Sequence, residues 1–423
     1  RNSTSDVGTA DAKLAGLEDL ASILDEVGKG DLEQDDGVLL NQLNDLRDLI
    51  SEAITNGIDE YDGLIRTSAT ALCRLFNSAA NSLTELKEKY ETRLSDQVDT
   101  INSILTNLRD LNVSIRNADI RGDNALELRD ERNRLLDELS QYVKIDVQYT
   151  MEDVGAGFMV ETMSVSLATG NKNKLVDGVY ASEMVMGTEA GGYRIGLHAL
   201  TDAKGNQQDP NATGVVLGDN DLYGALQSTR EILTEKGEYS LPADTAADPE
   251  ANVKRGIPYY QKALDNLANE FATQMNELNH IYQTNAAGDQ VLAEGAGNLF
   301  SMGSNTNDAV TYVDPNDPNQ GITAWITAAN ISISQAWAEG DVSIQAKSDP
   351  SAPSGDTSNL VRFLEMFDRE QIFNPDDVAG GDAVGANYEG TFEDMLLRIQ
   401  SVLAEDQMAT SAVLTNYTVT INE

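Results

Sequence analysis

The chain has 423 residues, and its 70 acidic residues outnumber its 29 basic residues to give a formal net charge of −41. Such a charge repels phosphate backbones and anionic lipid headgroups, so we expect neither a nucleic acid nor a membrane as a partner. A hydrophobic content of 40% is enough for buried cores in the two or three domains that this length predicts, whereas a single cysteine, Cys73, excludes an internal disulfide framework.

Three helical patterns open the chain. Apolar residues at three- and four-residue spacing predict amphipathic helices over residues 8–27 and 39–54, with an acidic loop over residues 31–37 between them. Gly28 and Gly30 would end the first helix. A third helical pattern covers residues 61–81, and the sequence leaves open whether it breaks before the segment that follows.

The strongest pattern is a long apolar stripe over residues 81–115, which no proline or glycine interrupts. At 1.5 Å per residue this helix would be roughly 50 Å long. A narrow apolar seam of that length needs partner helices packed lengthwise, as in helical bundles and coiled coils. The large residues of the stripe stand three or four positions apart: Leu83, Leu86, Tyr90, Leu94, Val98, Ile101, Leu105, Leu108, Leu111 and Ile115.

A further helix is predicted over residues 125–143, after the loop Arg121-Gly122-Asp123-Asn124. Charged residues such as Arg129, Asp130 and Arg132 stand between its apolar positions, and opposite charges at helical spacing favour the helix by about 0.2–0.5 kcal/mol per pair. The residues expected to face inward are Leu126, Leu128, Leu135, Leu136, Leu139 and Val143.

At Lys144 the spacing of apolar residues changes from the helical period to strict alternation, which is typical of a strand. Short strand-like runs follow at intervals of roughly ten residues, separated by Gly, Asn and Asp. We therefore predict a small antiparallel β unit over residues 146–221, with its two ends close together at Ile145 and Leu222.

Helical spacing returns after residue 221 and predicts a helix ending near Leu233, followed by a polar loop over residues 237–256. Pro258 suits the first turn of a second long helix, over residues 258–282, which carries Leu264, Leu267 and Asn276. We expect this helix to be the antiparallel neighbour of the first long helix.

The last part of the chain alternates between loops and helices. Residues 285–319 and 374–390 are rich in Gly, Asn, Asp and Ala, so we predict loops there. Residues 359–367 and 392–419 read as helices, whereas residues 322–333 and 342–344 fit either strands or irregular structure.

These elements predict a mainly α fold with an inserted β-rich domain, that is, an α+β chain in which an elongated bundle of long helices carries an outward antiparallel β domain. We place the helical domain at residues 1–145, 222–300 and 320–423, the inserted β-rich outer domain at residues 146–221, and a loop at residues 301–319.

Residue types that perform chemistry are scarce. Of the two histidines, His198 lies in a strand-like run and His280 at the end of the second long helix, and Cys73 lies on an apolar helical face, so all three fit structural positions better than catalytic ones. No metalloprotease, P-loop or serine-hydrolase motif is present. We therefore predict no enzyme activity, no catalytic residue, no cofactor and no metal ligand.

Two acidic turns and one triplet also contain residue types that bind ligands in other proteins. Residues 218–221 and 314–317 could contact calcium, but neither has the twelve-residue spacing of a calcium loop, so we interpret both as turns. Arg121-Gly122-Asp123 spells a triplet that integrins recognise, but three residues in a loop between helices match by chance too easily to support that function.

The run over residues 125–140 closely resembles the "LRDERNxLLDELS" segment of the family of bacterial flagellar hook-associated protein 1, the first hook–filament junction protein. Residues 102–123 resemble the family's "INSILxNLxxLNxxIRxADIxGD" segment, and residues 264–280 resemble "LDxLAxxxxxxxNxxH". Shorter matches at residues 11–17, 298–300 and 326–331 fall in the same order. The residues that carry this family signature or its packing are Leu94, Val98, Ile101, Leu105, Leu108, Arg129, Asp130, Arg132, Leu135, Leu136, Leu139, Leu264, Leu267 and Asn276.

The resemblance implies a non-catalytic subunit of the extracellular flagellum that forms a ring-like layer between hook and filament. Its implied partners are other copies of itself, the hook protein, the second junction protein, and an export chaperone that would bind a C-terminal segment. The implied export route is the flagellum's own type III channel. The family's terminal core segments "SGL…A…NxANxxTxGYxR" and "SGVSxDEE" do not occur in this sequence, so we expect them to flank it and we expect this chain alone not to polymerise.

Three alternatives stay open at this stage. The first is another filament-type subunit, either flagellin or the second junction protein. The second is a secreted or surface adhesin that binds through the β unit or through Arg121-Gly122-Asp123. The third is an enzyme of unknown type, against which the scarcity of His and Cys argues.

Overall fold

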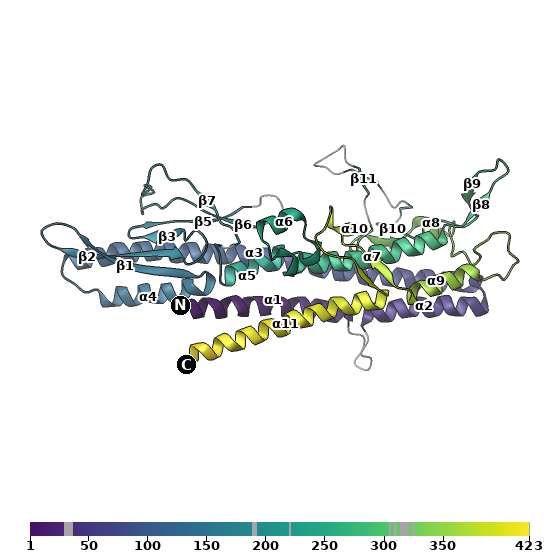
Figure 1. Cartoon of the computed structure of the whole chain (residues 1–423), viewed down its shortest axis with the longest axis horizontal. Helices are drawn as coiled ribbons and strands as arrows, with labels where there is room; N and C mark the ends of the chain where they lie inside the picture. Colours follow the sequence, from purple (N-terminus) through teal and green to yellow (C-terminus); the bar gives the residue numbers. More distant parts are fainter. Residues whose placement is uncertain are drawn as a thin grey trace.

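The computed structural model describes residues 1–28, 37–187, 193–219, 221–303, 306–307, 311–313, 321–323 and 326–422. These residues form an elongated body in which long helices run parallel to the long axis (Figure 1). Small antiparallel sheets lie along one side of the helices, so the predicted fold class is confirmed.

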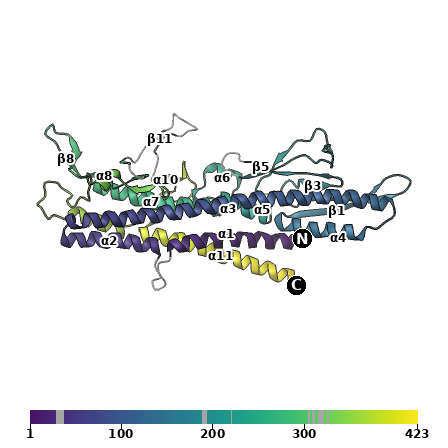
Figure 2. The same cartoon turned by 180° about the vertical axis from the view of Figure 1, so that it is seen from behind.

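Three helices form the backbone of the body. Helices α1 (Asn2–Gly28) and α2 (Val38–Asn56) follow one another along the axis, and α3 (Ile58–Ile120) runs back beside both (Figure 2). The third helical pattern and the long stripe are one continuous helix of 63 residues, about 95 Å long at 1.5 Å per residue. The acidic loop expected at residues 31–37 lies almost entirely outside the described residues.

The apolar stripe of α3 is buried as predicted, and only Leu111 is half-buried. Different elements cover α3 in turn: α2 near its start, α1 and α5 (Ala225–Thr234) in the middle, and α4 (Leu126–Tyr142) with several strands toward its end. Burying one large aliphatic side chain stabilises a fold by about 1.5–3 kcal/mol, so a stripe of this length holds much of the body together. Helix α7 (Ile257–Asn279) packs beside α3 in the antiparallel direction that we expected.

The β unit consists of two antiparallel sheets. The first has the order β1-β2-β3-β4 and the second the order β5-β6-β7. Both lie against the second half of α3, and Asn102 of that helix donates to the Met184 carbonyl at 2.8 Å and accepts from the Met184 N–H at 2.7 Å. The strands are β1 (Ile145–Asp153), β2 (Met159–Leu167), β3 (Lys174–Asp177), β4 (Tyr180–Ala181), β5 (Met184–Gly187), β6 (Arg194–Leu197) and β7 (Val215–Val216).

The chain leaves the helices and returns to them at adjacent points. The Lys144 backbone N–H donates to the Tyr223 carbonyl at 3.0 Å, which confirms the expected closeness of the two ends of the β unit. Gly224 follows with a φ of +108°, and a Cβ there would lie 2.4 Å from the Tyr142 carbonyl oxygen. Only glycine fits this close approach between two backbones.

Helix α5 starts three residues later than the predicted start at Leu222, and the polar loop expected at residues 237–256 contains three short helical turns. These are η1 (Gly237–Tyr239), α6 (Pro242–Ala247) and η2 (Ala251–Val253). Pro258 occupies the first turn of α7, as predicted, but α7 ends at Asn279, because the chain continues into β8 (Tyr282–Thr284). The prediction of helix up to residue 282 is therefore wrong.

The loop predicted at residues 285–319 is also partly wrong, because short strands interrupt it. Strand β8 pairs with β9 (Gln290–Leu292), β10 (Phe300–Met302) with β13 (Ile331–Ile333), and β11 (Thr311–Val313) with β12 (Gly321–Thr323). The stretch left undecided at residues 322–333 thus contains strands, whereas no strand forms at residues 342–344. The turn at residues 314–317 lies outside the described residues.

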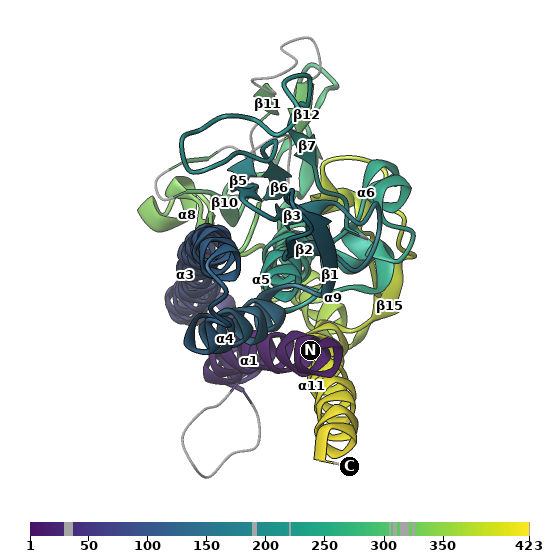
Figure 3. The same cartoon turned by 90° about the vertical axis from the view of Figure 1, so that its left-hand side faces the viewer.

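The C-terminal part adds α8 (Gln335–Glu339), α9 (Ser358–Asp368), α10 (Asp376–Ala379) and α11 (Phe392–Asn422), with strands β14 (Gln371–Phe373) and β15 (Tyr388–Gly390) paired between them. The helices predicted at residues 359–367 and 392–419 are confirmed, whereas the loop at residues 374–390 contains α10 and β15. Helix α11 packs along α1 and then diverges from it, on the side of the body opposite the strands (Figure 3).

Candidate functional site

The family-signature residues of α4 meet the β unit through one carboxylate. Glu161 on β2 accepts from Arg129 Nη1 at 2.8 Å and from Arg132 Nη2 at 2.7 Å. Arg129 also binds Asp119, near the end of α3, at 2.8 Å. The two arginines therefore fasten helix α4 to both the first sheet and the long helix.

Arg132 is buried, although its position between apolar residues suggested a solvated charge. Its side chain is 4% exposed. It donates to Asn112 Oδ1 at 3.1 Å and its guanidinium lies 5.4 Å from the centre of the Tyr149 ring. Asn112 in turn donates to the Gly178 carbonyl at 2.8 Å, so the chain of contacts runs from α4 through α3 to the turn after β3.

Sequence reasoning missed Glu161 and Asn112. Glu161 is a single charged residue in a strand-like segment, so no pattern of charges marks it in the sequence. In the structure it lies opposite Met151 in the antiparallel pair of β1 and β2, with its side chain toward α4. Asn112 stands one turn after Leu108, on the same face of the long helix as the apolar stripe, and a polar residue at such a position is the sequence signal that could have pointed to it. Asp130 does not join the cluster and is exposed.

The remaining apolar signature residues are buried where the stripes predict. Leu94, Val98, Ile101, Leu105 and Leu108 lie along α3, and all five are at most 5% exposed. Their counterparts on the other two helices, also buried, are Leu135, Leu136, Leu139, Leu264 and Leu267. Two residues of α4 that were predicted to face inward do not lie in the core: Leu126, the first residue of the helix, is exposed, and Leu128 is half-buried.

Asn276 fixes the second long helix to the strands that follow it. Its Oδ1 accepts from the backbone N–H groups of Leu299 and Phe300 at 2.8 and 2.9 Å, and its Nδ2 donates to the Phe300 carbonyl at 3.0 Å. Asn279, one turn later, donates through Nδ2 to the carbonyls of residues 297 and 343 and accepts from the N–H of residue 345. These asparagines satisfy backbone groups that would otherwise be buried without partners.

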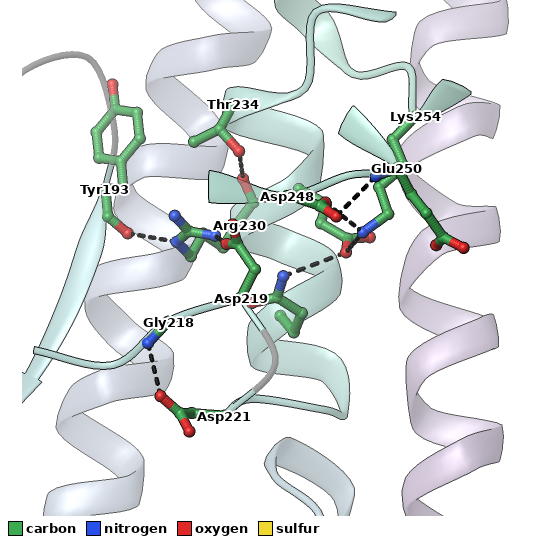
Figure 4. A network of polar contacts seen from close by, with 11 residues as sticks. Tyr193, Gly218, Asp219, Asp221, Arg230, Thr234, Asp248, Glu250 and Lys254 are labelled. Carbon is green, nitrogen blue, oxygen red and sulfur yellow. Dashed lines mark hydrogen bonds and ion pairs between the residues drawn. The ribbon is translucent and has the colours of Figure 1, made fainter. Parts of the chain in front are cut away.

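A second polar network surrounds α5 (Figure 4). Arg230 forms an ion pair with Asp219 and donates through Nε to the Tyr193 carbonyl at 2.9 Å. On the other side of the helix, Lys254 binds Asp248 at 2.8 Å and Glu231 at 3.3 Å. This network ties the loop after the β unit and the segment around η2 to α5.

The acidic stretch predicted as a turn at residues 218–221 is described except for residue 220, and the Asp221 N–H donates to the Gly218 carbonyl at 3.1 Å, as in a turn. Asp221 accepts from the Gly218 N–H at 2.7 Å through Oδ2 and from the Asn171 N–H at 2.8 Å through Oδ1. Asp219 forms an ion pair with Arg230. In the part of the chain that the structure describes, no group of three or more His, Cys, Asp or Glu side chains is arranged to hold a metal.

Burial perturbs one carboxyl group of this region strongly. Desolvation, together with repulsion from Glu231, raises the pKa of Glu235 to about 8. Burial likewise raises the pKa of the Cys73 thiol to about 12, so that group stays protonated and acts as a small apolar side chain.

The two histidines and the integrin-type triplet occupy ordinary positions. His198 follows β6 and lies 3.6 Å from Glu183, and His280 Nε2 lies 2.7 Å from Asn298 Oδ1. Arg121, Gly122 and Asp123 form the exposed turn between α3 and α4, where Asp123 accepts from the Ala125 N–H. Among the helices of the described ranges, none has the length and hydropathy that crossing a membrane requires.

Long helices whose apolar stripes are largely covered by other elements, and polar side chains that fasten one element to another, define a structural protein with an elongated scaffold. The model of the flagellar hook-associated protein FlgK helical domain matches residues 32–289, more than half of the chain. The chain therefore belongs to the FlgK family of flagellar hook-associated proteins, and the resemblance seen in the sequence is confirmed.

Two individual proteins agree with this assignment. The chain is 26% identical over 290 residues to flagellar hook-associated protein 1 of Bacillus subtilis strain 168, an alignment that covers 67% of the chain. The chain spans about half, 52%, of the length of that relative. The solved structure of the flagellar hook junction protein FlgK from Burkholderia pseudomallei matches with a TM-score of 0.58 over 100% of both chains at 14% identity, which shows a shared fold.

Proposed function

We propose that this chain is the body of a non-catalytic structural subunit of the extracellular bacterial flagellum, where it joins the hook to the filament as part of a ring-like layer. The observation that carries the proposal is the family match over residues 32–289, which contains α3, α4, the β unit and α7. The similarity to hook-associated protein 1 of B. subtilis supports the same place in the flagellum.

The geometry suits such a role. A layer between two rotating tubes must transmit torque, and a helix of 63 residues that is supported by other elements along its length resists bending better than a chain of short elements. The ion pairs of Arg129 and Arg132 would keep the β unit aligned with this helix under load. No step of this role needs a catalytic group.

The partners in this proposal are other copies of the same subunit, the hook protein, the second junction protein and, before export, a chaperone for a C-terminal segment. We also infer the division of the chain into a helical body (residues 1–145, 222–300 and 320–423), an inserted outer unit (146–221) and a connecting loop (301–319). The packing of α1 along α11 supports a single body built from both ends of the chain.

Deletion of the gene in the source bacterium tests the proposal. We expect cells that still build hooks but carry no filaments, release flagellin into the medium and do not swim, and we expect a plasmid copy of the gene to restore motility. Antibodies against the chain should label the wild-type flagellum between hook and filament. Filaments of normal length on the deletion strain would refute the proposed role.

A further inference from the structure

The long edge of the first sheet is free. The hairpin of β1 and β2 extends along α4 at one end of the body (Figure 1), and β1 is the outermost strand in the order β1-β2-β3-β4. Strands β1 and β2 have nine residues each, whereas no other described strand has more than four. In the described ranges, β1 is therefore the one long strand that lies at the edge of a sheet.

The register of β1 and β2 shows which backbone groups of β1 point away from the sheet. The Ala168 N–H donates to the Lys144 carbonyl at 3.0 Å, and the Val154 N–H donates to the Phe158 carbonyl at 2.9 Å. The even-numbered residues of β1 therefore form the hydrogen-bonded pairs with β2, because such pairs alternate with non-hydrogen-bonded pairs in an antiparallel ladder. The residues whose N–H and carbonyl groups point to the free edge are Val147, Tyr149, Met151 and Asp153.

Nothing in the described part of the chain occupies this edge. No described residue forms a hydrogen bond with the outward backbone groups of β1, and residues 148–153 are all exposed. Proteins commonly protect such an edge with proline, lysine, a bulge or a covering loop. The strand contains neither proline nor lysine, and its register with β2 runs through nine pairs without a bulge. An exposed row of unpaired N–H and carbonyl groups is a template for one further strand.

Apolar side chains line one face of this edge. Side chains alternate between the two faces along a strand, so Tyr149 and Met151 share a face. Met159 of β2 lies on the same face, because it stands opposite Asp153 in the ladder. The three apolar side chains are 47%, 60% and 51% exposed in this order. An added strand lays every second side chain beside Tyr149 and Met151, and aliphatic residues at those positions gain the most from burial.

Three carboxylates and no cation give β1 a negative charge. Asp146 and Glu152 stand on the other face, six residues apart and near the two ends of the strand, and Asp153 adds the third carboxylate. Arg116 of α3 pairs with Glu152, but no described residue forms an ion pair with Asp146 or Asp153. A second copy of β1 brings the same carboxylates, and like charges on neighbouring strands are destabilising. The edge therefore favours a segment that contains lysine over a second copy.

We propose that the free edge of β1 binds an extended segment of a partner protein as an added antiparallel strand. The backbone of the segment pairs with the outward N–H and carbonyl groups, its aliphatic residues lie beside Tyr149 and Met151, and its lysines lie on the face of Asp146 and Glu152. The antiparallel direction is favoured because it gives the more stable ladder per residue. This inference goes beyond the proposed function and does not depend on the place of the protein in the flagellum.

The probe is a peptide with blocked ends, Lys-Val-Thr-Val-Thr-Val-Lys, whose two lysines have the same spacing as Asp146 and Glu152. Binding of its fluorescein-labelled form to the full chain is followed by fluorescence polarisation. We expect saturable binding that Met151→Pro weakens at least about tenfold, because proline removes one outward N–H and no bond to β2. Asp146→Lys should weaken binding about tenfold, since it turns an attraction into a repulsion. Glu389→Lys reverses an exposed charge on β15, is the matched control and should change the affinity less than about twofold.

Methylation of backbone nitrogens in the peptide tests the geometry of the added strand. In the antiparallel arrangement the valine N–H groups face β1 and the threonine N–H groups face solvent. N-methylation of the valines should therefore abolish binding, whereas N-methylation of the threonines should change the affinity less than about threefold.

Amide exchange of the chain, labelled with nitrogen-15 at tyrosine, methionine and threonine, gives a second readout of the geometry. The N–H groups of Tyr149 and Met151 should exchange at least about tenfold more slowly in excess peptide, because they gain a hydrogen-bond partner. The N–H of Thr150 is already bonded to β2 and should change little.

The proposal is overturned if the wild-type chain does not bind the peptide, if both methylated peptides bind equally well, or if Met151→Pro and Asp146→Lys bind like the control. Protection of the Tyr149 and Met151 amides that grows with the concentration of the chain alone would identify a second copy as the occupant and would also overturn it. Circular dichroism establishes that the variants are folded. If Met151→Pro does not fold, Asp146→Lys, which changes an exposed side chain, keeps the test decisive.

Discussion

Replacement of Arg132 by alanine should loosen the β unit from the helices. The change removes a charged hydrogen bond of 2.7 Å to Glu161 and a second bond of 3.1 Å to Asn112 at a site that is 4% exposed. Glu161 keeps Arg129 as a partner, so the loss is smaller than for a fully broken buried pair, whereas Asn112 Oδ1 is left without a donor. We expect a local destabilisation of about 3 kcal/mol.

Amide hydrogen exchange measures this effect where it occurs. A loss of about 3 kcal/mol corresponds to exchange that is roughly a hundredfold faster for the protected amides of β1 and β2, provided that they exchange through local opening. Arg134→Ala is the matched control, because Arg134 is exposed and pairs only with Glu131 and Glu138 of its own helix. If the β1 and β2 amides of both variants exchanged at the same rate, the role of Arg132 as a fastener would be refuted.

Four further perturbations follow from the same structure. Asn276→Ala should lower the free energy of unfolding in urea by about 3 kcal/mol, because it leaves the N–H groups of Leu299 and Phe300 and the Phe300 carbonyl without their partner; a loss below about 1 kcal/mol would contradict the hydrogen-bond assignment. Gly224→Ala should lower the melting temperature more than Gly57→Ala, because both have positive φ but only Gly224 has a backbone atom within 3 Å of the added Cβ; the reverse order would refute the steric argument. The pKa of Glu235 is raised from 4.5 to about 8, so the protonated carboxyl stabilises the fold fully below pH 4.5, and this stabilisation is lost as the pH rises to 8. In Glu235→Gln the melting temperature should therefore depend less on pH between pH 5 and 8 than in the wild type. An unchanged dependence would count against the burial of this carboxyl. Because the chain has a net charge of −41, the melting temperature of the wild type should rise between about 0.05 and about 1 M NaCl as salt screens the repulsion between its acidic groups. A melting temperature that does not depend on salt would show that the charges are already compensated.

The long elements could be predicted because their patterns repeat many times. Ten apolar positions define the stripe of α3, and no alternative structure buries them together. The same holds for α7 and for the inner half of α11, where Ile399 and Leu403 are buried. The apolar pattern does not fix the ends of a helix: it leaves open a break near residue 81, where the structure shows that α3 is continuous.

The short elements could not be predicted, because they depend on distant partners. Strands β8 to β13 have three residues each, too few for a period, and β10 is held in place by hydrogen bonds from Asn276 of α7, a residue more than twenty positions away in the sequence. The burial of Arg132 has the same origin: the helical pattern marks a charged position as solvated, and only the packing of β2 brings Glu161 to it. Contacts between residues far apart in the sequence decide such sites, and a single sequence does not display them.

The hydrogen bond between Lys144 and Tyr223 holds the two ends of the β unit together, and this affects how the unit can change during evolution. Because the chain leaves the helical body and re-enters it at neighbouring residues, the seventy-odd residues of the β unit can be shortened, lengthened or exchanged while the helices keep their register. A replacement must keep the groups that the helices bind: partners for Asn102 and Asn112 of α3, a carboxylate for the buried Arg132 of α4, and apolar residues that cover the second half of α3. The face of the β unit that points away from the helices is therefore the part that can diversify, whereas these contacts constrain the face that lies against α3 and α4.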